Sequence, residues 1–232
     1  MRGDDAVASR RLFLIWQNPD TRKFVRVGVL SELVDGRYVY EYTDGAHGDG
    51  FHPLVQFPDL DRVYVSRGLP AFFVNRLMNN RRPSYPDYLN AIGVDSPDLE
   101  TPMELLARTG GPRFTDTFHL VDDFTSNDDG LIVTRFLASG IRHIAGSDDA
   151  LKRVHPGDRL ELRAERENPV NRRALLVCAV SDEALGYVPD WLLEDLTALR
   201  ARSESFEIYA ERVSPDEHPH MRLLCRVEAE AH

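Results

Sequence analysis

The chain has 232 residues, of which 42% are hydrophobic and 28% are charged, a composition typical of globular proteins and not of disordered or fibrous ones. Its formal net charge of −10 argues against a protein that coats nucleic acid along its length. The sequence contains no apolar run long enough to cross a membrane, no secretory signal pattern, and only two cysteines, both in strand-like segments. We therefore expect a cytoplasmic protein.

Basic residues are unevenly distributed along this acidic chain. The segment from Leu131 to Leu175 carries nine Lys or Arg and six Asp or Glu, a local balance of +3. Lys23 and Lys152 are the only lysines, and arginine binds phosphates and bases better than lysine does. A G+C-rich genome also produces such an arginine bias, so the bias alone does not locate a site.

The N-terminal residues have the pattern of short strands followed by a loop. Arg11–Trp16 and Phe24–Leu30 are rich in Phe, Val, Leu and Ile, which predicts two strands. Tyr38–Tyr42 alternates tyrosine with other residues after an Asp-Gly turn, which predicts a third. Thr43–Gly50 is rich in Asp and Gly and is expected to be a loop.

Helical spacing replaces the strand pattern after Pro70. The apolar residues between Phe72 and Met78 predict a helix that ends by Arg82, because Pro83 follows. Asp87–Ile92 and Thr101–Thr109 predict two further short helices. The second of these begins with a Thr cap, a Pro and a Glu, which is a strong start signal.

A polar and acidic segment, Asp122–Gly130, divides the chain. Its turn-forming residues indicate the end of one domain and a linker to the next. We therefore expect two domains, residues 1–125 and residues 131–232.

The second domain has a mostly β pattern. Arg159–Ala164 alternates apolar and charged residues, Ala174–Val180 is a continuous apolar run typical of a buried strand, and Ala184–Val188 is another short strand. Phe206–Val213 and Met221–Val227 alternate strictly and predict a hairpin with a long connection. Between these strands, a helix with an apolar stripe of leucines begins after Pro189-Asp190. The predicted fold class is α+β, with a β-rich N-terminal domain that carries short helices.

Five sequence strings in the second half resemble a HIRAN domain, over about Leu131 to Arg202. They occur in the order of that family and at matching spacings: Gly140-Ile141-Arg142-His143, Gly157-Asp158-Arg159-Leu160-Glu161-Leu162, Glu165-Arg166-Glu167-Asn168-Pro169-Val170-Asn171, Ala174-Leu175-Leu176-Val177 and Leu185-Gly186-Tyr187-Val188-Pro189. The resemblance implies a small OB-like β-barrel, here with one helix and a C-terminal hairpin. In large DNA-remodelling ATPases this domain grips single-stranded DNA at a free 3′ end.

The resemblance also implies a set of nucleic-acid-binding residues. By position, Arg142 matches a basic residue near the DNA backbone, His143 an aromatic residue that can stack, and Asn168 a polar contact. The further residues expected at this site are Arg166, Asn171, Arg172 and Arg173. Each also has a structural interpretation, as a solvated arginine, a packed edge residue or a turn former.

Two departures from the family pattern bear on this site. The family has Tyr and then Asp after the Pro, whereas this chain has Val170 and Asn171. The aromatic platform is lost, and stacking is worth about 1–3 kcal/mol per base. A neutral amide also replaces the carboxylate that would accept a hydrogen bond from a 3′ hydroxyl.

The first half resembles the small N-terminal domain of HipA-type toxin kinases, over about Leu12 to Arg108. The resemblance rests on generic strands and on the Phe-rich segment Ser66–Leu77. In those kinases this domain is an accessory lobe, and no kinase motif for nucleotide, metal or catalytic base occurs here. The resemblance therefore implies protein contacts and not phosphoryl transfer.

Other chemistry has little support in the sequence. No phosphate-binding loop, zinc-protease motif or Cys-x-x-Cys motif occurs, and no cofactor or metal is expected. The histidines His47, His52, His218 and His220 lie in turn-like loops, where metal binding would be adventitious. The acidic cluster Asp122, Asp123, Asp128 and Asp129 is expected to be a solvated linker, with a hydrolase site as the alternative.

We therefore expect a non-catalytic adaptor that binds single-stranded DNA or DNA ends, with a role in DNA repair or in toxin–antitoxin or defence systems. Its N-terminal domain would contact a protein partner such as a HipA-type kinase, a nuclease or a helicase. The alternative is a protein-binding regulator, antitoxin-like or part of a defence complex, that binds no DNA. A continuous basic groove around Arg142, Arg166, Arg172 and Arg173 would favour DNA. Scattered ion pairs with Glu165 and Glu167 would favour the regulator.

Overall fold

A computed structural model describes residues 8–127 and 129–231 and divides the chain into two compact units. The first unit comprises Met1–Asn79 and Glu100–Asp123, and the second comprises Asn80–Leu99 and Phe124–His232. The predicted first domain included the Asn80–Leu99 segment, which the structure groups with the second unit. Among the described residues, no helix has the length and apolar character needed to cross a membrane.

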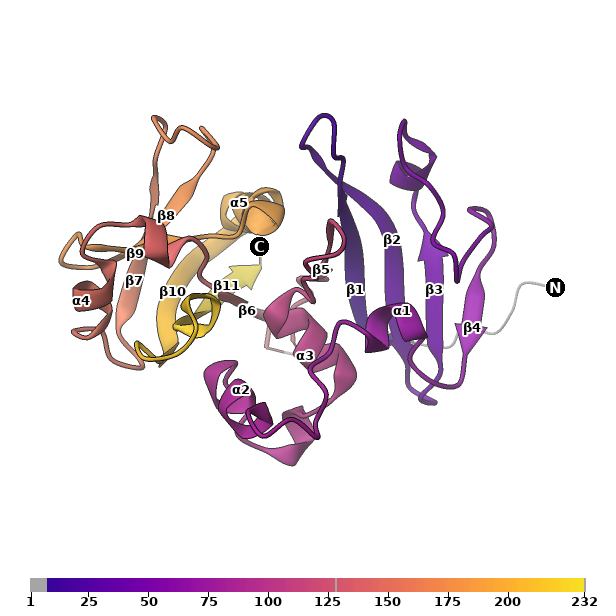
Figure 1. Cartoon of the computed structure of the whole chain (residues 1–232), viewed down its shortest axis with the longest axis horizontal. Helices are drawn as coiled ribbons and strands as arrows, with labels where there is room; N and C mark the ends of the chain where they lie inside the picture. Colours follow the sequence, from indigo (N-terminus) through magenta and orange to yellow (C-terminus); the bar gives the residue numbers. More distant parts are fainter. Residues whose placement is uncertain (1–7, 128, 232) are drawn as a thin grey trace. The chain divides into compact units, whose positions relative to one another are not determined.

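The first unit is built on a five-stranded antiparallel sheet (Figure 1). Its strands, in the order in which they lie side by side, are β4 (Tyr64–Ser66), β3 (Tyr38–Tyr42), β2 (Phe24–Leu33), β1 (Ala8–Gln17) and β5 (Phe118–Asp122). The three strands predicted near the N-terminus are confirmed. The short strands β4 and β5 were not predicted, and β4 has only three residues, too few to show a period of two.

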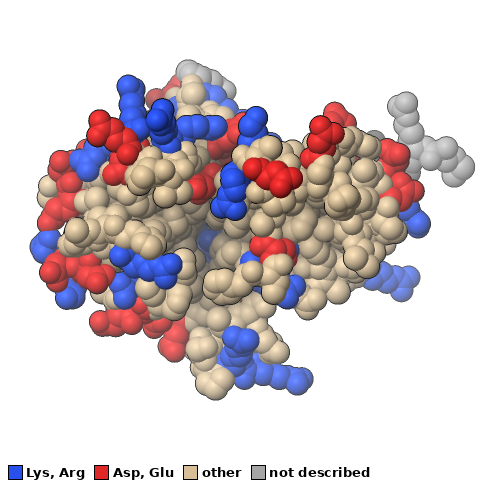
Figure 2. All heavy atoms as spheres, turned by 45° about the horizontal axis from the view of Figure 1, so that its top comes forward, with Lys and Arg blue, Asp and Glu red and all other residues tan. Residues whose placement is uncertain are grey.

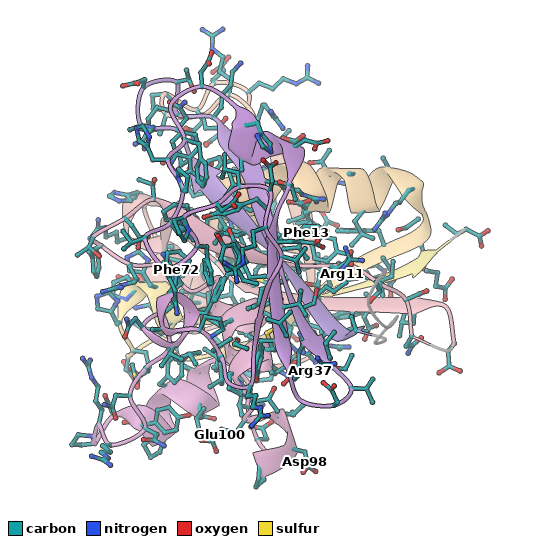
Figure 3. All side chains as sticks on the ribbon, turned by 90° about the vertical axis from the view of Figure 1, so that its right-hand side faces the viewer. Arg11, Phe13, Arg37, Phe72, Asp98 and Glu100 are labelled. Carbon is teal, nitrogen blue, oxygen red and sulfur yellow. The ribbon has the colours of Figure 1, made fainter. Side chains whose placement is uncertain are left out.

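One face of this sheet carries the core of the first unit. Leu12, Leu14 and Trp16 alternate along β1 and are buried against Phe73 and Leu106 from two helices. The helical segments of this unit are η1 (Asp44–His47), α1 (Ala71–Val74) and α3 (Pro102–Thr109). Figure 3 shows Phe72 on the core side of the sheet and Phe13, with Arg11, on the other side. On that other face, the Arg26 guanidinium lies 4.2 Å from the Phe13 ring centroid.

Two local expectations about helices have opposite outcomes. The cap of α3 is confirmed, because the Thr101 side chain accepts a hydrogen bond from the Glu104 backbone N–H. The long helix expected from Phe72 to Arg82 is wrong, because α1 ends at Val74. Arg76 explains the difference: its buried guanidinium donates to the Gly111 carbonyl at 2.9 Å and pairs with Asp116 at 2.7 Å, which turns the chain toward the core.

The second unit contains a six-stranded sheet, all of whose pairings are antiparallel. Its strands, in spatial order, are β6 (Leu131–Leu137), β11 (Leu223–Ala231), β10 (Ser203–Val213), β7 (Arg159–Ala164), β8 (Leu175–Ala179) and β9 (Ala184–Tyr187). The predicted hairpin and the strands near 159–188 are confirmed. The predicted OB-like barrel is not confirmed, because in the described residues the first and last strands are linked only through an isolated bridge between Ser139 and Tyr187.

Short helices complete the second unit. They are α2 (Tyr85–Ala91), η2 (Pro97–Leu99), η3 (Ile141–His143), α4 (Ser147–Leu151), η4 (Asp190–Leu192), α5 (Leu193–Arg202) and η5 (Pro219–Met221). The predicted leucine stripe is confirmed, since Leu192, Leu193, Leu196 and Leu199 are all buried. α5 and α2 both pack against β10.

His119 on β5 makes the stability of the first unit depend on pH. Burial, together with the nearby Arg76 charge, lowers the pKa of His119 from 6.5 to about 4. In the unfolded chain this imidazole takes up a proton near pH 6.5, while the folded protein keeps it neutral. The stabilising contribution of neutral His119 is therefore complete above about pH 6.5 and is lost as the pH falls toward about 4.

We expect His119→Gln to remove this part of the pH dependence. Between about pH 7 and pH 4 the wild-type chain should lose up to about 3 kcal/mol more than the variant, measured by hydrogen exchange in β1 and β5. Equal losses in the two proteins would show that carboxylates alone govern the acid response.

Candidate nucleic-acid interface

The seven residues predicted to bind nucleic acid lie on two segments of the second unit. Arg142 and His143 belong to η3 and are exposed. The other five lie in the β7–β8 loop, residues 165–174, where the arginines are exposed and the two asparagines are half-buried. The structure therefore assigns the predicted site to one short helix and one loop.

Glycine permits the backbone turn that presents η3. Gly140 has φ +64°, and a Cβ atom there would lie 2.8 Å from Cδ2 of Tyr187. Just before it, the Ser139 and Tyr187 backbones exchange two hydrogen bonds of 2.8 Å. Gly186 also lacks a Cβ that would crowd Ala138 and Ile141. Two of the strings quoted for the family resemblance, around Gly140 and Gly186, are thus packed against each other.

Side chains hold the β7–β8 loop in a fixed shape. The side-chain Oδ1 of Asn168 accepts hydrogen bonds from the Val170 and Asn171 backbone N–H groups at 2.9 and 3.0 Å. The side-chain Oδ1 of Asn171 likewise accepts from the Arg173 backbone N–H at 2.9 Å. The two asparagines therefore form the turn, as their structural interpretation predicts, and they leave the arginines to face solvent.

Tyr187 connects the two segments, a role that the sequence did not reveal. Its hydroxyl donates to Glu165 Oε2 at 3.0 Å, and the same oxygen accepts from Asn168 Nδ2 at 2.6 Å. Burial and this hydrogen bond to Glu165 raise the pKa of Tyr187, so the hydroxyl stays protonated as a donor. The only sequence signal for this role was the Gly before the Tyr at the end of β9.

Asp190 is a second residue that sequence reasoning missed. The Asn171 amide donates to Asp190 Oδ1 at 2.8 Å, which holds an exposed carboxylate beside the loop. A negative charge is thus present next to residue 171 even though residue 171 itself is neutral. Its presence had no local signal, because Asp190 lies 19 residues away along the chain.

Ion pairing distinguishes two sets of arginines in the second unit. Those paired with a carboxylate are Arg135, Arg153, Arg159, Arg163, Arg212, Arg222 and Arg226. Within the described ranges, no carboxylate pairs with Arg142, Arg166, Arg172 or Arg173. The ion pairs with Glu165 and Glu167 that would favour a regulator are therefore absent from the part of the chain that the structure describes.

The tip of the β7–β8 loop combines positive charge with an apolar residue. Val170 is 88% exposed among Arg166, Arg172 and Arg173. In Figure 2, Lys and Arg side chains gather at the upper left of the view, with Asp and Glu beside them. The loop thus offers cationic groups for phosphate and a small apolar surface for a base.

A hollow at the other end of the β7–β8 hairpin is a less suitable site for an anion than the β7–β8 loop. It has a volume of about 250 Å³ and is lined by residues that include Arg153, Asp158, Arg159 and Ser181. Arg153 pairs with Glu183, and Arg159 pairs with Glu207 at 3.2 Å, so its positive charges are already compensated. None of the seven predicted residues lines it.

The acidic cluster is only partly a solvated linker. Asp122 is the last residue of β5 and pairs with Arg10 at 2.8 Å, and Asp123 pairs with Arg11 at 3.5 Å. Asp122 therefore corrects the expectation of a solvated segment, while Asp128 lies outside the described residues. Carboxylates paired with arginines are poorly placed to serve a hydrolase, because the arginines occupy their acceptor oxygens.

The described residues contain no metal-binding cluster and no disulfide. No group of three or more His, Cys, Asp and Glu residues among them is placed to hold a metal ion. Cys178 and Cys225 are buried and form no disulfide, and burial raises the pKa of both thiols.

Comparisons with known proteins agree with the resemblance predicted for the second half. The family model of the HIRAN domain matches residues 133–232. No curated protein matches the chain. The HipA-like resemblance of the first half is not supported by these comparisons and stays a prediction.

Two solved structures are similar to part of the chain. A protein from Lactobacillus plantarum is 15% identical, with a TM-score of 0.35, over 44% of this chain and 100% of that one. The HIRAN domain of human HLTF is 14% identical, with a TM-score of 0.34, over 45% of this chain and 83% of that one.

Tyr187→Phe tests the connection between the two segments. Removing the hydroxyl leaves Glu165 Oε2 with only its hydrogen bond from Asn168 and should lower the stability of the β7–β8 loop by about 0.5–1.5 kcal/mol. We expect faster hydrogen exchange in residues 165–174 and unchanged exchange in β10 and β11. Unchanged exchange throughout would mean that the two asparagines hold the loop without Tyr187.

Proposed function

We propose that the second unit binds single-stranded DNA or DNA ends through η3 and the β7–β8 loop. The observation that carries this proposal is the group of exposed arginines at these two segments that form no ion pair with any described carboxylate. An exposed guanidinium can make bidentate hydrogen bonds to phosphate. The match of residues 133–232 to the HIRAN domain supports the same function.

Each predicted residue has a role in this proposal. Arg142, Arg166, Arg172 and Arg173 contact phosphates, and His143 stacks on a base or contacts the backbone. Asn168 and Asn171 act mainly by shaping the loop, since their side chains already bond within the protein. Val170 contacts a base with less area than an aromatic ring would provide, so we expect weaker stacking.

In this proposal the whole protein is a non-catalytic adaptor with two separate domains, residues 1–125 and residues 131–232. The first domain resembles the HipA N-terminal domain and contacts a protein partner. A kinase of that type, a nuclease or a helicase would be a suitable partner, in DNA repair or in a toxin–antitoxin or defence system. The second domain would be an OB-like barrel closed at the Ser139–Tyr187 bridge. The protein would act in the cytoplasm.

One observation favours a different function. The chain has a net charge of −10, which repels polyanions at low salt. A protein-binding regulator, antitoxin-like or part of a defence complex, is the alternative that this charge supports. Direct binding measurements separate the two, because the regulator binds no DNA at any salt concentration.

The decisive experiment titrates the full chain against labelled single-stranded, blunt duplex and recessed-end DNA at two salt concentrations. We expect single-stranded or recessed-end DNA to bind more tightly than blunt duplex. Arg142→Ala, Arg172→Ala and Arg173→Ala should each weaken binding about equally on all sequences. Each should also lower the salt slope on single strands by about 0.7.

Arg163→Ala is the matched control for these variants. Arg163 lies on the same hairpin but pairs with Asp182, so its loss should leave the salt slope unchanged. If the three test variants bind DNA as tightly as the wild type does, DNA binds elsewhere on the protein. If no DNA binds to the wild-type chain, the regulator is the better interpretation.

Variants of Asn171 and Asp190 test whether the β7–β8 loop binds the 3′-terminal hydroxyl of a DNA strand. Asn171→Asp places two carboxylates where one hydrogen bond of 2.8 Å now exists, so it should loosen the loop and weaken binding. Asn171→Asp combined with Asp190→Asn restores the bond with donor and acceptor exchanged. If a terminal 3′ hydroxyl enters here, the double variant should favour 3′-hydroxyl ends over 3′-phosphorylated ends.

Two results would contradict these roles of residue 171 and of its hydrogen bond to residue 190. Equal binding of both kinds of end by the double variant would show that no terminal hydroxyl is received at residue 171. Binding by the double variant as weak as that of Asn171→Asp would show that the bond to Asp190 does not shape the loop.

A further inference from the structure

A pair of histidines lies next to η3, outside the set of residues assigned to the site above. His218 and His220 flank Pro219 at η5, in the connection between β10 and β11, and η5 contacts η3. Both side chains are exposed, and their rings stack with centroids 5.2 Å apart at an angle of 28°. The two rings therefore form a small aromatic and titratable surface beside Arg142.

The histidine pair and the η3 residues act on one another electrostatically. Partial burial, followed by the charges of His218 and Arg142, lowers the pKa of His220. On η3, the His143 Nε2 atom accepts a hydrogen bond from Arg142 Nε at 3.1 Å. Three imidazoles and one permanent cation thus belong to one cluster.

The neighbouring charges largely compensate one another. From α4, Asp148 pairs with Arg222 at 2.6 Å, and Asp149 pairs with Lys152 at 3.1 Å. Arg222 also donates to the Glu217 carbonyl oxygen at 2.8 Å. The remaining charges of the η5 connection are the exposed carboxylates of Asp216 and Glu217, which precede the pair in the chain. Imidazole is the side chain whose unperturbed charge changes between about pH 5 and pH 8, so a pH series tests the histidine pair.

We propose that His218 and His220 bind a phosphate group and extend the proposed nucleic-acid site from Arg142 across η5. This inference rests on the proposed function, because the phosphate would belong to a nucleic-acid backbone. An anion placed between Arg142 and the histidines removes the repulsion among their positive charges. Binding then draws protons onto the histidine pair, and by linkage the affinity rises as the pH falls.

The test is a pH series of binding titrations with the full chain and a labelled polythymidine strand at constant ionic strength. Thymine does not titrate in this range, so the protein sets the profile. We expect affinity to rise about tenfold between about pH 7.5 and about pH 5.5, which corresponds to an average net uptake of about half a proton for each strand bound. The double variant His218→Gln, His220→Gln should show less than a threefold rise and should match the wild type at about pH 8.

One single variant and one further readout serve as controls. His155→Gln removes an exposed histidine near Asp158 on the loop before β7, and it should keep the full pH profile. A second readout is the imidazole resonances, since the pKa values of His218 and His220 should rise when the strand is added. Both histidines are exposed, but His218 Nδ1 accepts a hydrogen bond from the His220 backbone N–H at 3.5 Å, so the melting temperature of the double variant is measured beside its affinity.

The outcomes separate this inference from the proposed function. If the strand binds but the double variant keeps the wild-type profile, the histidines do not bind phosphate and only this inference is overturned. A profile that survives in the double variant but is lost in His143→Gln would assign the pH dependence to η3, with the same conclusion. If no strand binds at any pH, the proposed function fails, and this inference fails with it.

Discussion

The candidate site depends on the position of Tyr187. Its backbone bridges to Ser139, its ring fills the space above Gly140, and its hydroxyl reaches Glu165 at the start of the β7–β8 loop. Three different kinds of contact therefore join β9 to the two segments that carry the exposed arginines. Because these segments are far apart in the sequence, their arrangement exists only when β9 is in place.

The charge distribution of the second unit determines which ligands this arrangement can bind. Seven arginines there pair with a carboxylate, and these ion pairs reduce their contribution to the field outside the protein. The unpaired ones stand out in an acidic protein, where long-range repulsion suppresses loose binding of polyanions. A ligand must then make close, well-aligned contacts, which the bonded shape of the loop favours.

The sequence predicted what depends on local pattern and missed what depends on distant partners. Apolar composition located β1 and alternation located β3, β7 and the C-terminal hairpin, and the Thr101 cap was readable because its partner lies three residues away. The end of α1 depends on contacts between Arg76 and residues about 40 positions later. The asparagine turns were likewise predictable, whereas the roles of Tyr187 and Asp190 required the folded arrangement of β9 and the loop.

The division of the chain has a consequence for biosynthesis. The segment Asn80–Leu99 belongs to the second unit, although the rest of that unit begins only at Phe124. On the ribosome this segment emerges early, and its partner strand β10, with the Arg212 that pairs with Asp95, appears more than one hundred residues later. Tyr85 and Tyr88 in α2 are buried in the finished protein. During that interval these two tyrosines lack β10, and the nascent chain has a window in which a chaperone could bind them.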